Sequence, residues 1–269
     1  MTLRRIHLAP DRIEGARGLL GPEARRYLAD VLRLAPGARV EVFDGRGGRY
    51  GAEIGPGFEW VTLGPREVAP AASVELSLVV ALAKGEKMDL VVQKVTELGV
   101  ARVLPFEGER SVVRLAPAKG EERAARWRRI AEEASRQCGR ADVPEIAAPT
   151  SLASALGALA PGTRVFAFHP GGGPLDAAGA ASLAAVPAGF LRLVFHPGGA
   201  PLPDLPAADE GPPGAAAVVG PEGGLTEAEV AACAAAGAVR AGLGPRVLRA
   251  ETAAIVAVAL LQARFGDLA

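Results

Sequence analysis

The chain has 269 residues, of which 49% are apolar and 22% are charged, and its formal net charge is zero. This composition is typical of a folded globular protein and argues against intrinsic disorder. No run of eighteen apolar residues occurs, and the N-terminus lacks the apolar stretch of a signal peptide, so no membrane segment is expected. The two cysteines, Cys138 and Cys233, and the three histidines show no metal-ligand spacing. We therefore predict no metal site, no disulfide and a cytoplasmic location.

Charge is unevenly distributed along the chain. Residues 1–140 carry five more basic than acidic side chains, whereas residues 141–269 carry five more acidic than basic ones. This asymmetry either indicates that the front half contacts a polyanion or reflects an ordinary solvated surface.

The first seventy residues are expected to form a small β-rich domain. Their hydrophobic pattern predicts one helix and then three strands, at residues 22–33, 39–45, 49–54 and 60–64. Residues 46–48, Arg-Gly-Gly, predict a hairpin turn between the first two strands. Residues 65–73 are rich in proline and alanine, so we predict a linker there.

From Val74 onward, predicted strands alternate with predicted helices. The continuous apolar run at 75–83 is typical of a strand buried on both faces of a parallel sheet. Further strands are expected near residues 101–106, 163–168, 191–195, 215–219 and 239–243. Helices are expected at residues 87–99, 118–137, 226–236 and 252–265. Thr226 and Glu229 have the spacing of a capping box. The fold class is therefore α/β, with a mostly parallel sheet covered by helices in a second domain at 74–269.

A short segment of this second domain occurs twice. VFAFHPGGGPL at 165–175 returns as LVFHPGGAPL at 193–202. The repeat is either a duplicated strand and turn or a chance similarity in a chain rich in alanine, glycine and proline.

Two strand-to-helix connections carry the residues that suggest chemistry. The first is Gly220-Pro221-Glu222-Gly223-Gly224, whose glycines allow close approach of the backbone to a ligand beside a helix N-terminus. By itself it is either a ligand loop or a plain tight turn. It matches neither the phosphate loop nor the dinucleotide-binding GxGxxG pattern.

The second connection runs from Leu243 to Thr252 and contains Arg246, Arg249 and Glu251. Ligands bind at the carboxyl ends of strands in open α/β sheets, so these charges are placed where a ligand would lie. Alternatively, the two arginines pair with Glu251 at the surface.

The order of amino acids in these segments is more specific than their composition. VVGPEGGLTEAEV, followed by LGPRVLRAETAAIVAVALLQARFGDL, closely resembles the C-terminal signature of the ribosomal RNA small subunit methyltransferase E family. The resemblance continues upstream through KGEKMDLVVQKVTELGV, Glu109-Arg110-Ser111, EEASRQCGRADVPEI and VLRLAPGARVEVFDG.

This resemblance implies a fold, an activity and partners. It implies a PUA-like β-barrel RNA-binding domain at 1–70 and a SPOUT methyltransferase domain at 74–269 with a C-terminal trefoil knot, an exception to the rule that chains are not knotted. It implies S-adenosylmethionine (SAM) as the cofactor and N3 of a uridine in 16S rRNA of the small ribosomal subunit as the methyl acceptor. It also implies a homodimer, and the nearly all-apolar helix predicted at 252–265 is consistent with burial on more than one side.

The resemblance further implies roles for individual residues. Cofactor binding is assigned to Gly220, Glu222, Gly223, Gly224, Leu243, Gly244, Val247 and Leu248. Arg249 is assigned to catalysis, with Glu251 either accepting a proton or holding Arg249 in place. RNA binding is assigned to Arg110, Arg136 and Arg140, whereas the arginines between 123 and 129 either contact phosphate or pair with glutamates on a solvated helix face.

One feature departs from the family pattern. The family has a single His-Pro turn before the glycine turn, whereas this chain has His169-Pro170 and His196-Pro197, and either copy can be the one beside the cofactor pocket. Two other functions remain open: methylation of another RNA by a related SPOUT enzyme, and RNA binding by an assembly factor without enzymatic activity.

Overall fold

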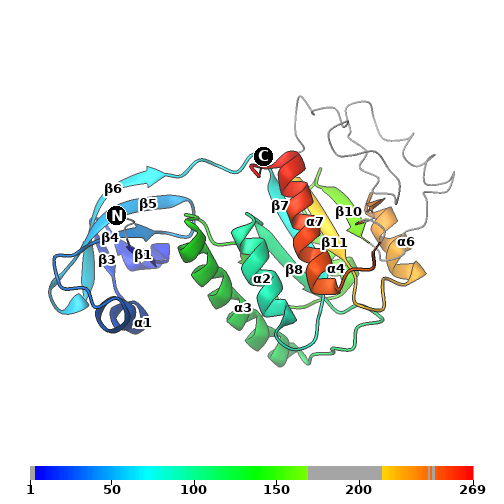
Figure 1. The fold of residues 1–269 in the computed structure, drawn as a ribbon, viewed down its shortest axis with the longest axis horizontal. Helices are drawn as coiled ribbons and strands as arrows, with labels where there is room; N and C mark the ends of the chain where they lie inside the picture. Colours follow the sequence, from blue (N-terminus) through cyan, green and yellow to red (C-terminus); the bar gives the residue numbers. More distant parts are fainter. Residues whose placement is uncertain (1–3, 169–213, 242, 244–245, 269) are drawn as a thin grey trace. The chain divides into compact units, whose positions relative to one another are not determined.

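The computed structural model describes residues 4–168, 214–241, 243 and 246–268. The predicted strand at 191–195, both His-Pro turns and Gly244 lie outside the described residues. The chain divides into two compact units (Figure 1). The first comprises Met1–Ala71 with Ala131–Val143, and the second comprises Ala72–Ile130 with Pro144–Ala269.

The first unit contains a six-stranded sheet in the order β1-β4-β5-β6-β3-β2. Only β1 and β4 pair in parallel; the other pairs are antiparallel. The strands are β1 (Arg4–His7), β2 (Ile13–Glu14), β3 (Arg17–Leu19), β4 (Arg39–Phe43), β5 (Gly48–Ile54) and β6 (Trp60–Val68). Helix α1 (Pro22–Arg26) is continued by a π-helical turn at Tyr27–Val31. The apolar side chains of this sheet form their own core, which includes Leu28, Val40 and Val61.

The predicted linker at 65–73 is partly wrong, because β6 continues to Val68. Residues Arg66 and Glu67 pair with Tyr50 and Arg49 of β5. The register shifts between Tyr50 and Ala52, so the extra residue on β6 is absorbed by a bulge. A bulge is a site where a strand tolerates proline, and Pro65 lies there.

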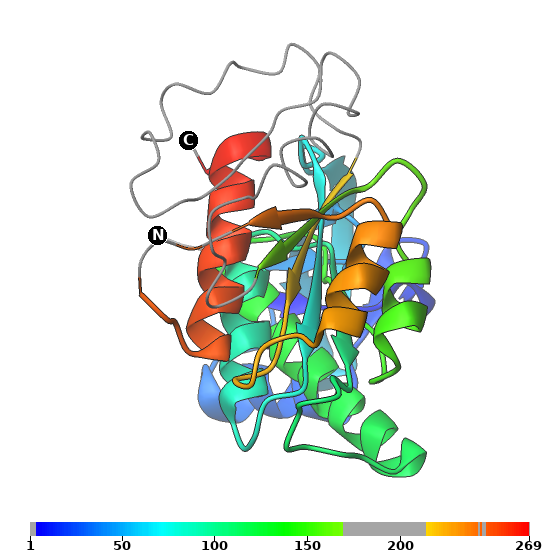
Figure 2. The ribbon, with the colours of Figure 1, turned by 90° about the vertical axis from the view of Figure 1, so that its right-hand side faces the viewer.

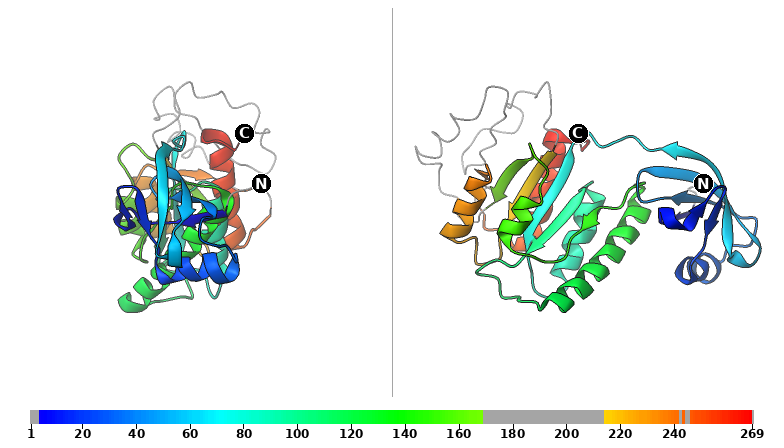
Figure 3. Two further views of the ribbon diagram at one scale, coloured as in Figure 1. Left: turned by 90° about the vertical axis from the view of Figure 1, so that its left-hand side faces the viewer. Right: turned by 180° about the vertical axis from the view of Figure 1, so that it is seen from behind.

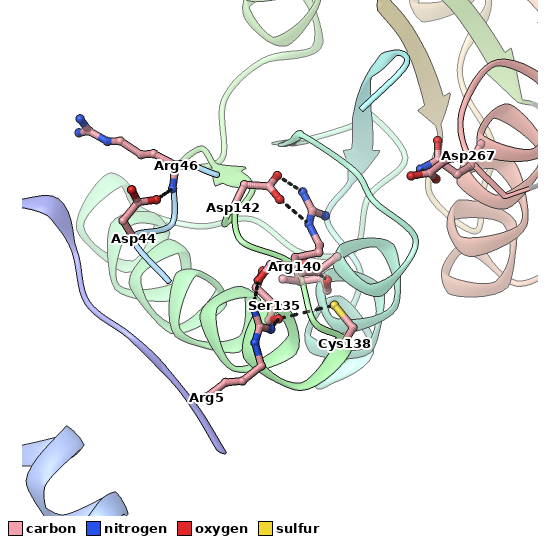
Figure 4. A network of polar contacts seen from close by, with 11 residues as sticks. Arg5, Asp44, Arg46, Ser135, Cys138, Arg140, Asp142 and Asp267 are labelled. Carbon is pink, nitrogen blue, oxygen red and sulfur yellow. Dashed lines mark hydrogen bonds and ion pairs between the residues drawn. The ribbon is translucent and has the colours of Figure 1, made fainter. Parts of the chain in front are cut away.

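The last turns of α3 (Pro117–Cys138) pack with the first unit, where they are held by arginines of the sheet. The Arg5 guanidinium donates hydrogen bonds to the carbonyl oxygens of Ser135, Arg136 and Arg140 (Figure 4). These carbonyls lie at or just beyond the C-terminal end of α3, where a cation is a favourable cap for carbonyl groups. Arg49 donates similarly to the Gly139 carbonyl.

The second unit contains a six-stranded sheet in the order β12-β10-β11-β7-β8-β9, and every pair of neighbouring strands is parallel. Its strands are β7 (Glu75–Ala81), β8 (Arg102–Phe106), β9 (Glu145–Ile146), β10 (Arg164–Phe168), β11 (Gly214–Val219) and β12 (Val239–Ala241). Its helices are α2 (Lys87–Glu97), the first part of α3, α4 (Leu152–Gly157), α6 (Glu227–Ala235) and α7 (Ala250–Phe265). The predicted α/β class with a parallel sheet is confirmed.

Helices cover both faces of this sheet. Helices α2 and α7 pack against each other, and α7 also contacts β7 and β11, whereas α4 and α6 pack over the opposite face (Figures 2 and 3). Every residue of β11 is buried, as its continuous apolar sequence predicts. Helix α7 begins at Ala250, two residues before the predicted start. Among the residues that the structure describes, no helix is long and apolar enough to span a membrane.

Candidate active site

The candidate site lies at the carboxyl edge of the parallel sheet. The chain leaves β7, β8, β11 and β12 at this edge, because parallel strands all point the same way. The connections begin at residues 82, 107, 220 and 242, and three of them lead directly into α2, α6 and α7. This is the edge at which open α/β sheets bind ligands.

The glycine turn after β11 requires glycine for more than one reason. Gly224 has φ +73°, a left-handed conformation that side chains disfavour. A Cβ atom at Gly220 would lie 2.9 Å from Cγ of Leu225, inside normal contact distance. The turn is closed by the Gly224 amide, which donates to the Pro221 carbonyl at 2.8 Å. Its tip is exposed at Glu222 and Gly223.

The connection after β8 is bound to this glycine turn. Arg110 donates from Nη1 to the Gly223 carbonyl at 3.1 Å. A Cβ atom on Gly223 would lie 3.1 Å from Cβ of Arg110, so a side chain at this position would require one of the two segments to shift. A second hydrogen bond joins the same connection to α6, because Oε1 of Glu229 accepts from the Glu109 amide at 2.9 Å.

Glu229 thereby has two structural roles. The predicted capping box is confirmed, since Glu229 Oε2 accepts from the Thr226 amide at 2.7 Å and Thr226 Oγ1 accepts from the Glu229 amide. The bond to Glu109 adds a contact to a residue 120 positions away. The buried carboxylate thus joins the start of α6 to the connection after β8.

We expect Glu229→Ala to lower the free energy of unfolding by about 2–4 kcal/mol, because it removes a helix cap and a hydrogen bond to a charged acceptor. Urea unfolding of the purified protein measures this. Glu227→Ala is the matched control, since Glu227 lies in the same helical turn but is exposed. Equal losses of stability in the two variants would contradict the role assigned to Glu229.

The connection after β12 presents a mixture of apolar and charged groups. Val247 is 78% exposed, Leu243 and Leu248 are half-buried, and Arg246 and Arg249 are exposed. Arg249 is the N-cap residue of α7, and its side chain makes no capping bond. Within the described part of the chain, the Arg249 guanidinium has no hydrogen-bond or ion-pair partner, so its donors are available to a ligand.

Glu251 pairs with a lysine rather than with Arg249. Lys87, the first residue of α2, has its Nζ 2.7 Å from Oε1 of Glu222 and 3.4 Å from Oε2 of Glu251. The predicted holding of Arg249 by Glu251 is therefore not observed among the described residues. Sequence reasoning assigned no role to Lys87; its position at the start of the helix after β7 was the only available signal.

The Lys87 ammonium and the Glu222 carboxylate keep each other charged. The hydrogen bond to Glu222 raises the pKa of Lys87, and the same bond lowers the pKa of Glu222. A carboxylate with a lowered pKa is a weak proton acceptor at neutral pH.

Arg136 and Arg140, predicted to bind RNA, belong to the first unit and have partners within it. Arg136 pairs with Glu133 and bonds and stacks on Tyr27, which leaves its side chain 19% exposed. Arg140 pairs with Asp142 (Figure 4) and is 14% exposed. Arg110 is exposed but donates to the glycine turn. Of these three arginines, Arg110 therefore presents the most accessible charge.

Comparison with known protein families gives two matches in this chain. Residues 70–186 and 180–262 match the RNA methyltransferase domain, and residues 20–62 match the RNA methyltransferase PUA domain. The domain match covers more than half of the chain.

Among individual relatives, ribosomal RNA small subunit methyltransferase E of Bacillus subtilis is 32% identical over 67% of this chain, an alignment that spans 62% of the Bacillus protein. The protein of the same name from Mycobacterium tuberculosis is 30% identical over 91% of this chain and 85% of its own length.

Solved structures agree with these relatives. A Legionella pneumophila protein described as a methyltransferase, in complex with the cofactor SAM, is 30% identical over the full length of both chains, with a TM-score of 0.79. Ribosomal RNA small subunit methyltransferase E from Neisseria gonorrhoeae, bound to SAM, is 25% identical over the full length of both chains, with a TM-score of 0.78. The resemblance noted in the sequence is thus confirmed, and the chain belongs to the ribosomal RNA small subunit methyltransferase E family.

Proposed function

We propose that this protein transfers the methyl group of SAM to N3 of a uridine in 16S rRNA of the small ribosomal subunit. The observation that carries the proposal is that the glycine turn and the loop before α7 follow strands that end at one sheet edge, where Arg249 is exposed and makes no capping bond. The names and bound cofactors of the relatives support the methyltransferase activity. The choice of uridine N3 rests on the motifs around residues 220–224 and 243–252.

The residues at this edge fit such a cofactor. SAM combines an apolar adenine ring with hydroxyl groups and charged ends. The exposed Val247 and half-buried Leu248 offer apolar surface for a ring, and the exposed Gly223 lets a ligand approach the backbone without side-chain obstruction. The Glu222 carboxylate, 46% exposed, can accept hydrogen bonds from hydroxyls. SAM supplies a methyl group already activated on a sulfonium.

The chain's contribution to the chemistry is orientation and stabilisation of charge. Uridine N3 carries a proton at neutral pH, so methylation breaks the N3–H bond, releases the proton to solvent and leaves S-adenosylhomocysteine. Negative charge develops on the base as the proton departs. The Arg249 guanidinium stays charged and donates from a planar fork, so it can stabilise the negative charge that spreads onto a carbonyl oxygen beside N3 while N3 itself stays open to the methyl group. Glu222 is a poor proton acceptor because Lys87 lowers its pKa.

The proposal extends to assembly and to RNA capture. On α7 the apolar residues Ile255, Val256 and Leu260 remain partly exposed, which supports a homodimer, testable by sedimentation at micromolar concentration. We also propose that the second domain contains the trefoil knot of the family, and that the protein acts in the cytoplasm alongside the ribosomal subunits.

Arg110 is our first choice for a contact to rRNA, ahead of Arg136 and Arg140.

The test is mass spectrometric mapping of methylated nucleotides in rRNA from cells that lack this gene. We expect one N3-methyluridine to be lost from 16S rRNA and to return when the wild-type gene, but not the Arg249→Ala gene, is restored. Loss of a methyl group from another RNA would indicate a related enzyme of different specificity. Unchanged methylation throughout would favour an RNA-binding assembly factor.

A further inference from the structure

Lys87 connects three segments that are distant in sequence. It begins α2, Glu222 lies on the turn after β11, and Glu251 lies in the first turn of α7. The lysine ammonium lies within ion-pair distance of both carboxylates, at 2.7 and 3.4 Å. It is therefore a cation placed between the glycine turn and the helix that follows the second loop.

The side chains of Lys87, Glu222 and Glu251 differ in burial, and this difference shows which of the two ion pairs matters more for the structure. Exposed ion pairs contribute little to stability, and the Lys87–Glu222 pair, whose side chains are 34% and 46% exposed, is of that kind. The Glu251 side chain is only 12% exposed, and its Oε2 is buried. A buried carboxylate is costly unless a cation lies beside it. Among the described residues, Lys87 is the cation paired with Glu251.

Without Lys87, two carboxylates would face each other across the gap between the turn and α7. Repulsion between the two carboxylates would favour moving the turn and the start of α7 apart. Movement of either element would alter the separation of the two loops to which cofactor binding is assigned.

We infer that Lys87 is a positioning residue that holds the 220–224 turn at a fixed separation from the start of α7 and so shapes the cofactor site. This rests on the proposed function, because it concerns the same site. Lys87 acts through Glu222 and Glu251 and is not itself assigned a contact with the reacting atoms.

Three variants distinguish this role from a general loss of structure. Lys87→Met removes the charge and keeps most of the volume. Lys87→Arg retains the charge. The double variant Lys87→Met with Glu251→Gln removes the buried carboxylate that Lys87→Met leaves without its cation. Lys94→Met is the matched control, because Lys94 is an ion-paired lysine on the same helix whose partner, Glu97, lies on that helix too.

We expect Lys87→Met to weaken SAM binding by about 10-fold, a change within the range of coupling between residues in contact. Turnover at saturating SAM and RNA should change by less than about 3-fold, since the reacting groups remain. Lys87→Arg should recover most of the affinity. The double variant should bind SAM more tightly than Lys87→Met alone, which simple loss of packing would not produce.

The experiment is calorimetric titration of each purified variant with SAM, together with single-turnover methylation at saturating ligand. Failure of the wild-type protein to bind SAM would overturn the proposed function. Wild-type binding with equal affinity in Lys87→Met would overturn only the positioning role, as would equal weakening in Lys94→Met or no recovery in the double variant. If Lys87→Met does not fold, Lys87→Arg and the double variant decide: recovery of SAM binding by both supports the inference, and weak binding by both overturns it.

Discussion

A Gly223→Val protein is expected to lose most of its affinity for SAM while remaining folded. A Cβ atom at this position would lie 3.1 Å from Cβ of Arg110, and the branched carbons of valine would add further overlap. Overpacking of this kind costs about 1–3 kcal/mol. The glycine turn can relieve this overlap by moving away from Arg110. The same free energy then appears as a loss of affinity for SAM of roughly 5- to 150-fold. Calorimetric titration with SAM measures the change.

The structure alters the reason for this prediction. The motif alone suggests that a side chain at 223 would meet the ligand, whereas the nearest atoms in the fold belong to Arg110. Gly157→Val is the matched control, because a Cβ atom there would have no neighbour within 4 Å and the residue lies in the same unit. Normal SAM binding by a folded Gly223→Val protein would refute the assignment of the glycine turn to the cofactor site.

Arg249→Ala is expected to lower turnover by ~100-fold or more, the scale seen when one donor that stabilises a developing anion is removed. The affinity for SAM should remain nearly unchanged, because the effect arises only as negative charge develops on the base. Stability should also be preserved, since the side chain is exposed and neither caps α7 nor pairs with a described residue. Single-turnover methylation of small ribosomal subunits at saturating SAM measures the rate.

Two comparisons make the Arg249 result specific. Arg249→Lys should restore the rate only in part, because a point charge cannot reproduce the planar fork of donors. Arg129→Ala removes an exposed arginine of α3 in the same unit and should leave the chemical step unchanged. A wild-type rate for Arg249→Ala with saturating RNA would exclude a catalytic role for Arg249.

Elements defined by local patterns were predictable from the sequence. The continuous apolar runs at 75–83 and 215–219 predicted buried parallel strands, because a strand covered on both faces has no polar face. The capping box at Thr226 and Glu229 was also predictable, because both partners lie within one helical turn and their spacing in the sequence is fixed. The glycine turn and the loop before α7 were recognisable from their sequence motifs.

Contacts between distant segments were decided only by the tertiary structure. Lys87 and Glu222 are 135 positions apart, and Glu109 and Glu229 are 120 apart, so no sequence spacing indicates either pair. Such pairs depend on strand order and on the position of each residue at the sheet edge, which hydrophobic periodicity does not specify. Proline at 65 likewise suggested a linker, because the bulge that accommodates it forms only when β5 supplies the opposite strand. Local chemistry therefore determined which segments could form the site, and packing at long sequence separation determined which of their charges meet.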